Sequence, residues 1–377
     1  MTTNINEIQR NWHFAETAFK EKNWHKALGY YQQIVALDQN HVPSLVRLAS
    51  IYIQLNDYES ARKYSLRASE IPSNNLPATL MLAKQLVIFS EKQRLKKYLN
   101  DFKPNASIDS QALAELSVML NTAGDINGAL RFVDLAIARD PLSAPAYYFR
   151  GNLKTFLGDS VGAQKDLNRC IEIKPKFAQA YWALSNHKNH SGSNDVTSKI
   201  RKQLALAKPG LKDEIYLSIA LHNELHKVGD YENAWTALDY GNKAKRKQIP
   251  YNHQATQKIF SSLKKIDWTT LANNAQKKVS LQQTPIFIVG MHRSGTTLLE
   301  QMLAGHSNIL DGGESASFAT QLKRAANTTK EMDAALIDKL ASTDLSKVGD
   351  WYAENNAWRF NGNQYFTEKL PSNFQFI

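Results

Sequence analysis

A repeat with a period of 34 residues constrains the fold of this sequence more than any other feature. The turn residues show it best, because Asn23 and Asp57 stand 34 positions apart and so do Asp125 and Asp159. The same separation relates several pairs of small or turn-forming residues: Ala15 and Ala49, Ala27 and Ala61, Ala129 and Ala163, and Pro141 and Pro175. A repeat of this length predicts pairs of antiparallel helices, in which the small residues allow close approach and each pair stacks on the next.

This pattern resembles the tetratricopeptide repeat, a two-helix unit of about 34 residues. Glycine precedes aspartate at several turns, as in Gly124-Asp125, where a left-handed residue is expected to end the first helix. The segment from Lys188 to Asp195 predicts a loop that explains the longer spacing before Asp230. Residues 1–248 are therefore assigned to an all-α tetratricopeptide-repeat solenoid, a kind of array whose concave groove usually binds extended peptides.

The chain is basic, with a net charge of +11 and a pI near 9.4. This balance favours anionic partners, and an acidic peptide is one of them. Lys and Arg are nevertheless scattered along the sequence, with only short clusters such as residues 243–247, and no nucleic-acid-binding module is recognisable. We therefore predict a solvated basic surface and no nucleic-acid partner.

Two features of the sequence bear on the compartment in which the protein works. Residues 1–19 resemble neither a signal peptide nor an anchor, and no apolar stretch reaches the length of a spanning helix, so no membrane association is expected. The single cysteine, Cys170, excludes an intrachain disulfide framework and is consistent with a reducing compartment. We predict a cytoplasmic protein in which Cys170 is a core contact between helices.

The pattern changes at Thr284, where a β-branched run leads into a glycine-bounded loop and an amphipathic helix. The spacing Gly290-x-x-x-x-Gly295-Thr is that of a phosphate-binding loop, in which backbone amides and a helix N-terminus surround an anion. Thr296 replaces the lysine that reaches nucleoside triphosphates, and Arg293 inside the loop supplies the positive charge instead. These residues favour binding of a 5′-phosphate or phosphosulfate over triphosphate hydrolysis. The helix is expected to bury one apolar stripe made of Leu298, Leu299, Met302 and Leu303.

The loop also resembles the 5′-phosphosulfate-binding loop of sulfotransferases that use 3′-phosphoadenosine 5′-phosphosulfate (PAPS), whose usual form is Pro-Arg-Ser-Gly-Thr-Thr. His292 stands where those enzymes have proline. The resemblance implies that PAPS is the sulfuryl donor, and binding by backbone amides, hydroxyls and arginine requires no metal. The residues that it assigns to donor binding are Gly290, His292, Arg293, Ser294, Gly295, Thr296 and Thr297.

Two further segments fit the same family. Residues 309–315 are similar to the Gly-Glu element of protein-tyrosine sulfotransferases and their bacterial relatives, which implies that Glu314 is the general base. Asp311 is a neighbouring carboxylate, and either residue could instead cap the next helix. A later strand followed by Lys-x-Pro implies that Lys369 assists departure of the leaving phosphate. Arg293 is expected to share this catalytic role by meeting the charge that grows on the bridging oxygen.

The arrangement looks most like bacterial proteins that join tetratricopeptide repeats to a tyrosine-sulfotransferase-like domain. After the repeats we predict connecting helices over residues 249–283 and the N-terminal part of an α/β, P-loop-like sulfotransferase domain over residues 284–377. A complete domain of this family also contains a motif of Arg and Ser that binds the 3′-phosphate of the nucleotide. Because no such motif follows in this sequence, we expect a truncated sulfotransferase domain that alone could be inactive.

These features predict a sulfotransferase that moves the sulfuryl group from PAPS to a hydroxyl, with protein tyrosine as the favoured acceptor. The repeats would bind the acceptor peptide or a partner protein in their groove. Sulfation of a glycan or small molecule is an alternative in the same class, and a catalytically inactive repeat scaffold is an alternative in a different class. A kinase or nucleotidase is disfavoured because Thr296 replaces the P-loop lysine.

Overall fold

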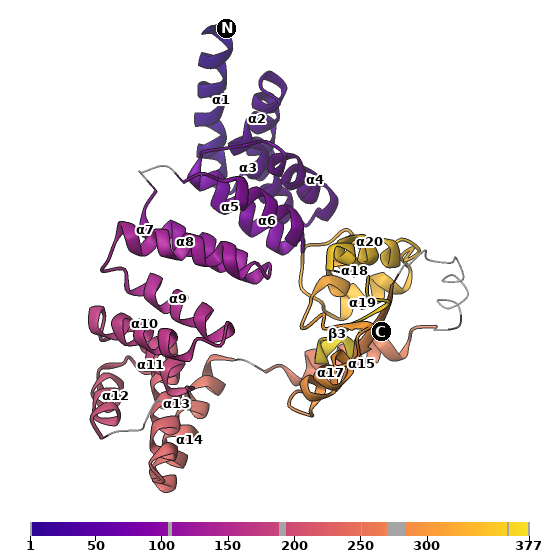
Figure 1. Cartoon of the computed structure of the whole chain (residues 1–377). Helices are drawn as coiled ribbons and strands as arrows, with labels where there is room; N and C mark the ends of the chain where they lie inside the picture. The colour runs from indigo at the N-terminus through magenta and orange to yellow at the C-terminus, as the bar shows by residue number, and fades with distance from the viewer. Residues whose placement is uncertain are drawn as a thin grey trace. The chain divides into compact units, whose positions relative to one another are not determined.

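The structure is a computed structural model that describes residues 2–104, 108–187, 194–249, 251–267, 269, 283–359 and 362–375. The chain divides into two compact units. The first is discontinuous in sequence, because residues 1–98 pack with residues 252–377, and residues 99–251 form the second. Figure 1 shows helices throughout the repeats and a small sheet in the C-terminal segment, which confirms the predicted fold class. The domain boundaries at residues 248 and 283 remain predictions.

The repeats of the first unit form helices that pack as antiparallel neighbours. They are α1 (Thr2–Lys20), α2 (Trp24–Leu37), α3 (Val42–Gln54), α4 (Tyr58–Ser69), α5 (Leu76–Ile88) and α6 (Lys92–Asp101). The predicted turn residues begin the second helix of each pair. Asn23 accepts a hydrogen bond from the Lys26 amide, and Asp57 accepts one from the Ser60 amide. These side chains satisfy backbone donors that a helix N-terminus otherwise leaves without a partner.

The second unit continues the same pattern. Its helices are α7 (Ser110–Thr122), α8 (Ile126–Arg139), α9 (Ala144–Phe156), α10 (Ser160–Ile173), α11 (Ala178–Ser185), α12 (Asn194–Leu206), α13 (Lys212–Lys227) and α14 (Tyr231–Gln248). Gly124 has a φ of +79° before the capping Asp125, as the sequence predicts for the end of a first helix. Of the loop predicted over residues 188–195, residues 188–193 lie outside the described residues, and Asp195 belongs to α12.

Small residues occupy the helix contacts that the 34-residue spacing predicts. The alanines that are fully buried there are Ala15, Ala27, Ala49, Ala61, Ala129 and Ala163. Cys170 is also fully buried, and burial raises the pKa of its thiol to about 12, so the thiol stays protonated and unreactive. The prediction that Cys170 is a core contact is confirmed.

The α/β segment contains a parallel sheet covered by short helices. Its elements after α15 (His253–Lys264) are β1 (Thr284–Ile288), α17 (Thr296–Ala304), β2 (Ile309–Leu310), α18 (Ser317–Ala325), α19 (Ala334–Ala341), α20 (Val348–Asn356), η1 (Ala357–Arg359), β3 (Tyr365–Lys369) and η2 (Pro371–Gln375). Residues 268 and 270–282 of the predicted connection lie outside the described residues. The core of this segment contains the ring of Phe366 against Tyr352, with Phe287 and Phe318 packed around them.

The strand order places three functional segments at one edge of the sheet. The order is β1-β3-β2, and both pairs are parallel, with Ile288 beside Lys369 and Leu310 beside Phe366. Because the carboxyl ends of parallel strands meet at the same edge, the loops after β1 and β2 reach the end of β3. The glycine loop, the segment that contains Glu314 and the lysine at the end of β3 therefore converge.

Polar contacts join the α/β segment to the turn between α3 and α4 within the first unit. Asn56 Oδ1 accepts hydrogen bonds from the Thr328 hydroxyl (2.6 Å) and the Thr329 amide (2.8 Å). Arg324 Nε lies 2.9 Å from Glu59 Oε1 in an ion pair. Residues 1–98 and the α/β segment therefore contact each other directly through specific side chains.

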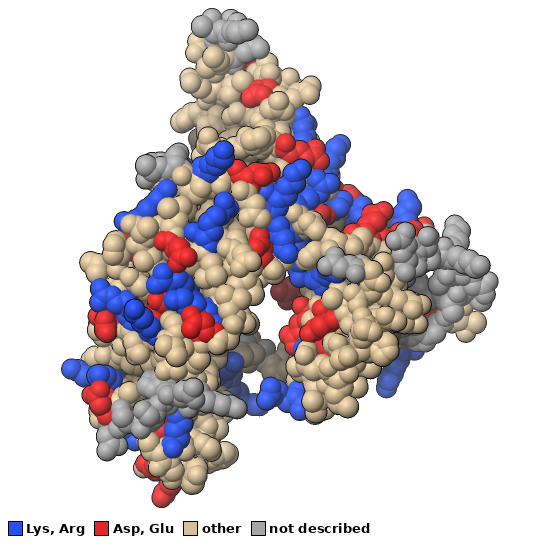
Figure 2. Space-filling view, in the orientation of Figure 1, with Lys and Arg blue, Asp and Glu red and all other residues tan. Residues whose placement is uncertain are grey.

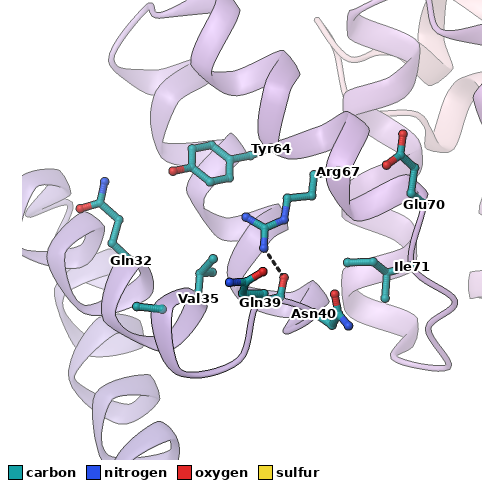
Figure 3. Close-up of a pocket in the computed structure, with 9 residues that line it drawn as sticks. Gln32, Val35, Gln39, Asn40, Tyr64, Arg67, Glu70 and Ile71 are labelled. Atoms are coloured by element: carbon teal, nitrogen blue, oxygen red, sulfur yellow. Dashed lines mark hydrogen bonds between the residues drawn. The ribbon is translucent and has the colours of Figure 1, made fainter.

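A hollow of about 600 Å³ lies between α2 and α4 (Figure 3). Polar side chains such as Gln32 and Tyr64 line much of it, and Arg67 Nη2 donates to the Gln39 carbonyl at 2.5 Å. All of its lining residues belong to the repeats, so the hollow is separate from the converging loops of the α/β segment.

Candidate active site

The glycine loop after β1 presents backbone amides to solvent. Gly295 has a φ of +96°, a left-handed conformation that glycine adopts without strain, and it begins α17 with no capping side chain. Within the part of the chain that the structure describes, the first amides of α17 therefore have no intrahelical or side-chain partner, as an anion site at a helix N-terminus requires. Ser294 Oγ donates to the Met291 carbonyl at 2.6 Å and closes the loop on itself.

The side chains predicted to bind the donor line this loop. Met291, His292, Arg293 and Ser294 are exposed, and so is Thr297, while Thr296 is half-buried. Arg293 adopts a φ of +65°, an unusual backbone conformation for a residue with a side chain. Among the described residues, no ion pair or hydrogen bond joins Arg293 to Glu314 or Lys369. The structure brings these predicted residues to the same sheet edge but gives Arg293 no direct contact with the other two.

The burial predicted for α17 is wrong. Leu298, Leu299 and Met302 are 67%, 49% and 69% exposed, and Leu303 is half-buried. The residue of this helix that is buried is Glu300, which is 2% exposed. The helix packs on the sheet through Glu300 because β3 offers that carboxylate hydrogen-bonding and charged partners, and the apolar stripe is turned away from the described sheet.

The segment after β2 is held by one side chain and one backbone amide of β3. Gly312 N donates to Thr367 Oγ1 (3.1 Å), and the amide of Lys369 donates to the Gly313 carbonyl (3.1 Å). A Cβ atom on Gly312 would overlap the Thr367 carbonyl oxygen, so the close approach requires glycine. Both glycines before Glu314 are thus hydrogen-bonded in place.

Lys369 and Glu314, the predicted acid–base residues, form an ion pair. Lys369 ends β3 and is only 4% exposed, and its Nζ donates to Glu314 Oε1. The Glu314 side chain is 62% exposed, so its carboxylate faces solvent beside the buried ammonium. A carboxylate and a cation of this kind can accept a proton from one reactant and neutralise charge on another.

Glu300 is a third member of this site that the sequence analysis missed. Its Oε1 accepts from Thr367 Oγ1 at 2.9 Å, and its Oε2 lies 3.9 Å from Lys369 Nζ. Burial raises the pKa of Glu300 and the Asp311 charge adds to this, while the Thr367 hydrogen bond and the Lys369 charge oppose it. The sequence signal that could have identified Glu300 is its charged side chain within the apolar run Leu298–Leu303.

A second buried carboxylate anchors the other face of β3. Glu368 is 2% exposed and accepts hydrogen bonds from Tyr352 Oη (2.6 Å) and Asn373 Nδ2 (3.1 Å). Burial raises the pKa of Glu368, although these two hydrogen bonds oppose the shift. Asn373 lies in η2, so this network fixes the chain immediately after Lys369 and restricts where the ammonium can move.

Comparison with known families assigns both parts of the chain. Residues 285–377 match the family model described as "Sulfotransferase family". The chain carries a sulfotransferase-family domain. Residues 18–85 and 144–177 match models of the tetratricopeptide repeat, so this domain follows a repeat module, as the sequence predicts. A sulfotransferase of this family uses a sulfuryl donor, and the converging residues described above all lie within the matched segment.

Curated relatives match only part of the chain. The chain is 22% identical over 231 residues to an uncharacterized protein of Aquifex aeolicus (strain VF5), covering 59% of this chain and 30% of that protein. It is 24% identical over 199 residues to Hsp70-Hsp90 organizing protein 1 of Glycine max, covering 43% of this chain and 35% of that protein. The chain thus spans about a third of the length of the curated relatives that it matches.

Two of the solved structures that resemble the chain are described as tetratricopeptide repeat proteins. YrrB, described as a TPR protein with an unusual peptide-binding site, is 20% identical, covers 45% of this chain and 87% of its own, and has a TM-score of 0.36. A tetratricopeptide repeat protein from Parabacteroides merdae is 13% identical, covers 66% of this chain and 95% of its own, and has a TM-score of 0.44.

The repeats ahead of the sulfotransferase-family domain contain a groove of about 450 Å³ in the second unit. Two kinds of residue recur in it at the repeat spacing. Asn152 lies on α9 and Asn186 directly follows α11, and Tyr148 and Trp182 lie beside them. Phe156 is 71% exposed at the same groove. Aromatic faces and side-chain amides are suited to the side chains and the backbone of an extended peptide.

Three further features concern the surface charge, the helices and the possible metal ligands of the described residues. On the face shown in Figure 2, Lys and Arg are interspersed with Asp and Glu. Within the described ranges, no helix has the length and apolar character needed to cross a membrane. Among those same residues, no group of three or more His, Cys, Asp or Glu side chains is placed to hold a metal ion.

Proposed function

We propose that this protein transfers the sulfuryl group of PAPS to a hydroxyl acceptor. The observation that carries the proposal is the convergence, at one sheet edge of the sulfotransferase-family domain, of an uncapped helix N-terminus, a buried lysine and an exposed glutamate. The loop residues suit the 5′-phosphosulfate, because the first amides of α17, the hydroxyls of Thr296 and Thr297, and the Arg293 guanidinium can all donate to an anion. The Ser294 hydroxyl can join them only by leaving the Met291 carbonyl.

The reaction needs one proton acceptor and one cation. As the acceptor oxygen forms its bond to sulfur, Glu314 takes the hydroxyl proton, and the bond from sulfur to the bridging phosphate oxygen breaks. The negative charge that develops on this oxygen is met by Lys369, with Arg293 and the loop amides around the rest of the phosphosulfate. Lys369 and Glu314 must separate for both roles, because in the resting structure they are bonded to each other.

We further propose that the acceptor is a tyrosine in a peptide held by the repeats. Support comes from the asparagines and aromatic rings that recur at 34-residue spacing in the groove, since such a ladder suits an extended chain. A glycan or small-molecule acceptor would not use this ladder. If the protein transfers sulfate to a glycan or small molecule, and Asn152→Ala leaves that rate unchanged, the proposal of a peptide acceptor is rejected.

The experiment that tests the enzyme measures transfer of radiolabelled sulfate from PAPS to a tyrosine-containing acidic peptide. The purified protein is compared with its Glu314→Ala form, for which we expect a loss of about 10²- to 10⁴-fold in kcat. Glu354→Gln, a change at an exposed glutamate of α20, is the control. If the desulfated nucleotide does not bind the parent protein and Arg293→Ala changes nothing, the inactive scaffold is favoured.

A further inference from the structure

The ammonium of Lys369 lies between two carboxylates of different character. Glu314 is largely exposed and bonds it directly, whereas the Glu300 side chain is 3% exposed and has its Oε2 at 3.9 Å. The two come from different elements, with Glu300 on α17 directly behind the glycine loop and Glu314 on the segment after β2. A lysine that is almost fully buried thus has one partner that can turn to solvent and one that cannot.

Glu300 is fixed in place by a chain of hydrogen bonds through β3. The amide of Gly312 donates to Thr367 Oγ1, and the Thr367 hydroxyl donates to Glu300 Oε1. This chain orients the carboxylate and leaves Oε2 on the side of Lys369. It also links α17, whose N-terminus forms the phosphosulfate loop, to the strand that ends in the lysine.

A buried glutamate at this position is costly for folding. Removing a carboxylate from water is expensive, and the partly compensating charge at 3.9 Å returns less than a packed apolar side chain would. The Asp311 charge nearby opposes ionisation of Glu300 further. A carboxylate at position 300 therefore contributes little to stability. Its position facing Lys369 indicates a functional role instead.

We propose that Glu300 is a positioning residue that holds the Lys369 ammonium in place when Glu314 turns to the acceptor. The inference rests on the proposed function, because it assigns Glu314 the base and Lys369 the cation. Because Glu314 Oε1 is bonded to the Lys369 ammonium in the resting structure, Glu314 must leave Lys369 before it can face the acceptor hydroxyl. Glu300 then supplies the charge that holds the buried ammonium in place and directed at the bridging oxygen.

Glu300→Gln tests this role with little change of shape. The amide oxygen of glutamine can still accept the Thr367 hydrogen bond, so the variant is expected to fold. We expect kcat for sulfate transfer to fall roughly 10- to 100-fold while the KM for PAPS changes less than about twofold, because the misplaced group acts in the transition state. Glu300→Asp, which restores the charge, should recover part of the rate, and Glu354→Gln should resemble the parent.

The pH profile separates positioning from a general loss of structure. The charged groups that contact the Lys369 ammonium are Glu300 from α17 and Glu314 from the segment after β2, and the Asp311 charge from that segment acts on Glu300. Removing the Glu300 charge leaves the two exposed carboxylates, so the alkaline limb of kcat should move to lower pH in Glu300→Gln. A variant that had only lost stability would lose rate without moving this limb.

A readout that needs no activity keeps this inference distinct from the proposed function. Acylation of the Lys369 amine can be followed across pH by mass spectrometry in the parent, Glu300→Gln and Glu354→Gln proteins. Reaction at lower pH in Glu300→Gln alone supports the inference, and identical labelling in all three overturns it. The inference is also overturned if the parent protein transfers sulfate and Glu300→Gln transfers it at the same rate. If the parent protein neither transfers sulfate nor binds nucleotide, the proposed function itself is rejected.

Discussion

The helical repeats and the α/β segment are held together by contacts of different range. In the repeats, each helix packs on its neighbours in sequence through buried alanines such as Ala27 and Ala163, and caps span three residues. In the α/β segment, the sheet joins residues far apart, with Ile288 beside Lys369, and Gly312 is tied to β3. Short-range contacts leave a periodic signal in the sequence, whereas long-range contacts must be seen in the structure.

The sharpest test of this contrast is Gly312→Ala, which we expect to have the largest effect. The added Cβ would overlap the Thr367 carbonyl oxygen, and overpacking against backbone costs about 3 kcal/mol. Hydrogen exchange followed by mass spectrometry should show loss of protection in β3 and η2 and little change in the repeats. Gly29→Ala in α2 is the control, because a Cβ there meets nothing within 4 Å. Equal protection of β3 in both variants would contradict the prediction.

Ala163→Leu makes the corresponding change in the repeats. Ala163 is fully buried in α10, so the larger side chain should cost about 2 kcal/mol of unfolding free energy. In a solenoid the loss should spread only to neighbouring helices, and hydrogen exchange should rise in α9, α10 and α11. Val161→Leu, at an 82% exposed position of the same helix, is the matched control. A uniform loss of protection along the whole chain would show that the repeats are less local than we infer.

Helix caps provide a comparison in which the two regions should behave alike. Asp159 accepts the Gly162 amide at 2.9 Å in the repeats, and Asp333 accepts the Leu336 amide at 2.8 Å in the α/β segment. Each Asp→Ala change should cost about 1 kcal/mol, measured by urea unfolding with a probe in each region. Asp→Asn, which keeps an oxygen acceptor, should cost less at both sites. A much larger cost at Asp333 would mean that its cap supports long-range contacts as well.

The smallest expected effect is a difference in the response to pH. Burial lowers the pKa of His187 from its ordinary 6.5, and the Lys227 charge adds to this. The unfolded chain therefore takes up a proton at a higher pH than the folded one, so this contribution to stability is present above pH 6.5 and is lost as pH falls. Urea unfolding of the second unit at pH 7.5 and about 5.5 should show the loss, and His187→Gln should reduce it. An unchanged pH dependence in the variant would rule out His187 as its source.

The buried carboxylates of the α/β segment should respond with the opposite sign. Burial raises the pKa of Glu300 and Glu368 from the ordinary 4.5, so the folded state holds their protons more tightly. Their contribution to stability is present below pH 4.5 and is lost as pH rises through the folded values. Acidification from neutral pH therefore weakens the contribution of His187 in the repeats and strengthens that of these carboxylates.

The sequence was sufficient to predict the repeats and the order of the functional segments. The 34-residue spacing located the buried alanines, because small residues occupy the same helix-contact positions in each repeat. The glycine spacing predicted the loop before α17, and resemblance to sulfotransferases singled out Glu314 and Lys369, which the structure places in contact. Their catalytic roles remain a proposal.

The orientation of α17 could not be predicted in the same way. A hydrophobic stripe is normally buried, yet the helix turns Glu300 inward and leaves Leu298 exposed. The reason lies in Thr367 and Lys369, which are distant in sequence and become neighbours of Glu300 only when β3 pairs with β1. The contact of Asn56 with Thr328 could not be predicted either, because no sequence pattern around one residue indicates the other as its partner.

The discontinuous first unit also determines the order of events during synthesis of the chain. The polar turn at Asn56 leaves the ribosome well before its partners Thr328 and Thr329, because residues 99–251 must be made first. At a translation rate of roughly 5–20 residues per second, this turn waits about 14 to 55 s for those partners. The exposed turn at Asn56 is polar, and water can satisfy its hydrogen-bonding groups until the partners are made. The nascent repeats can therefore remain folded without presenting an aggregation-prone face at this turn.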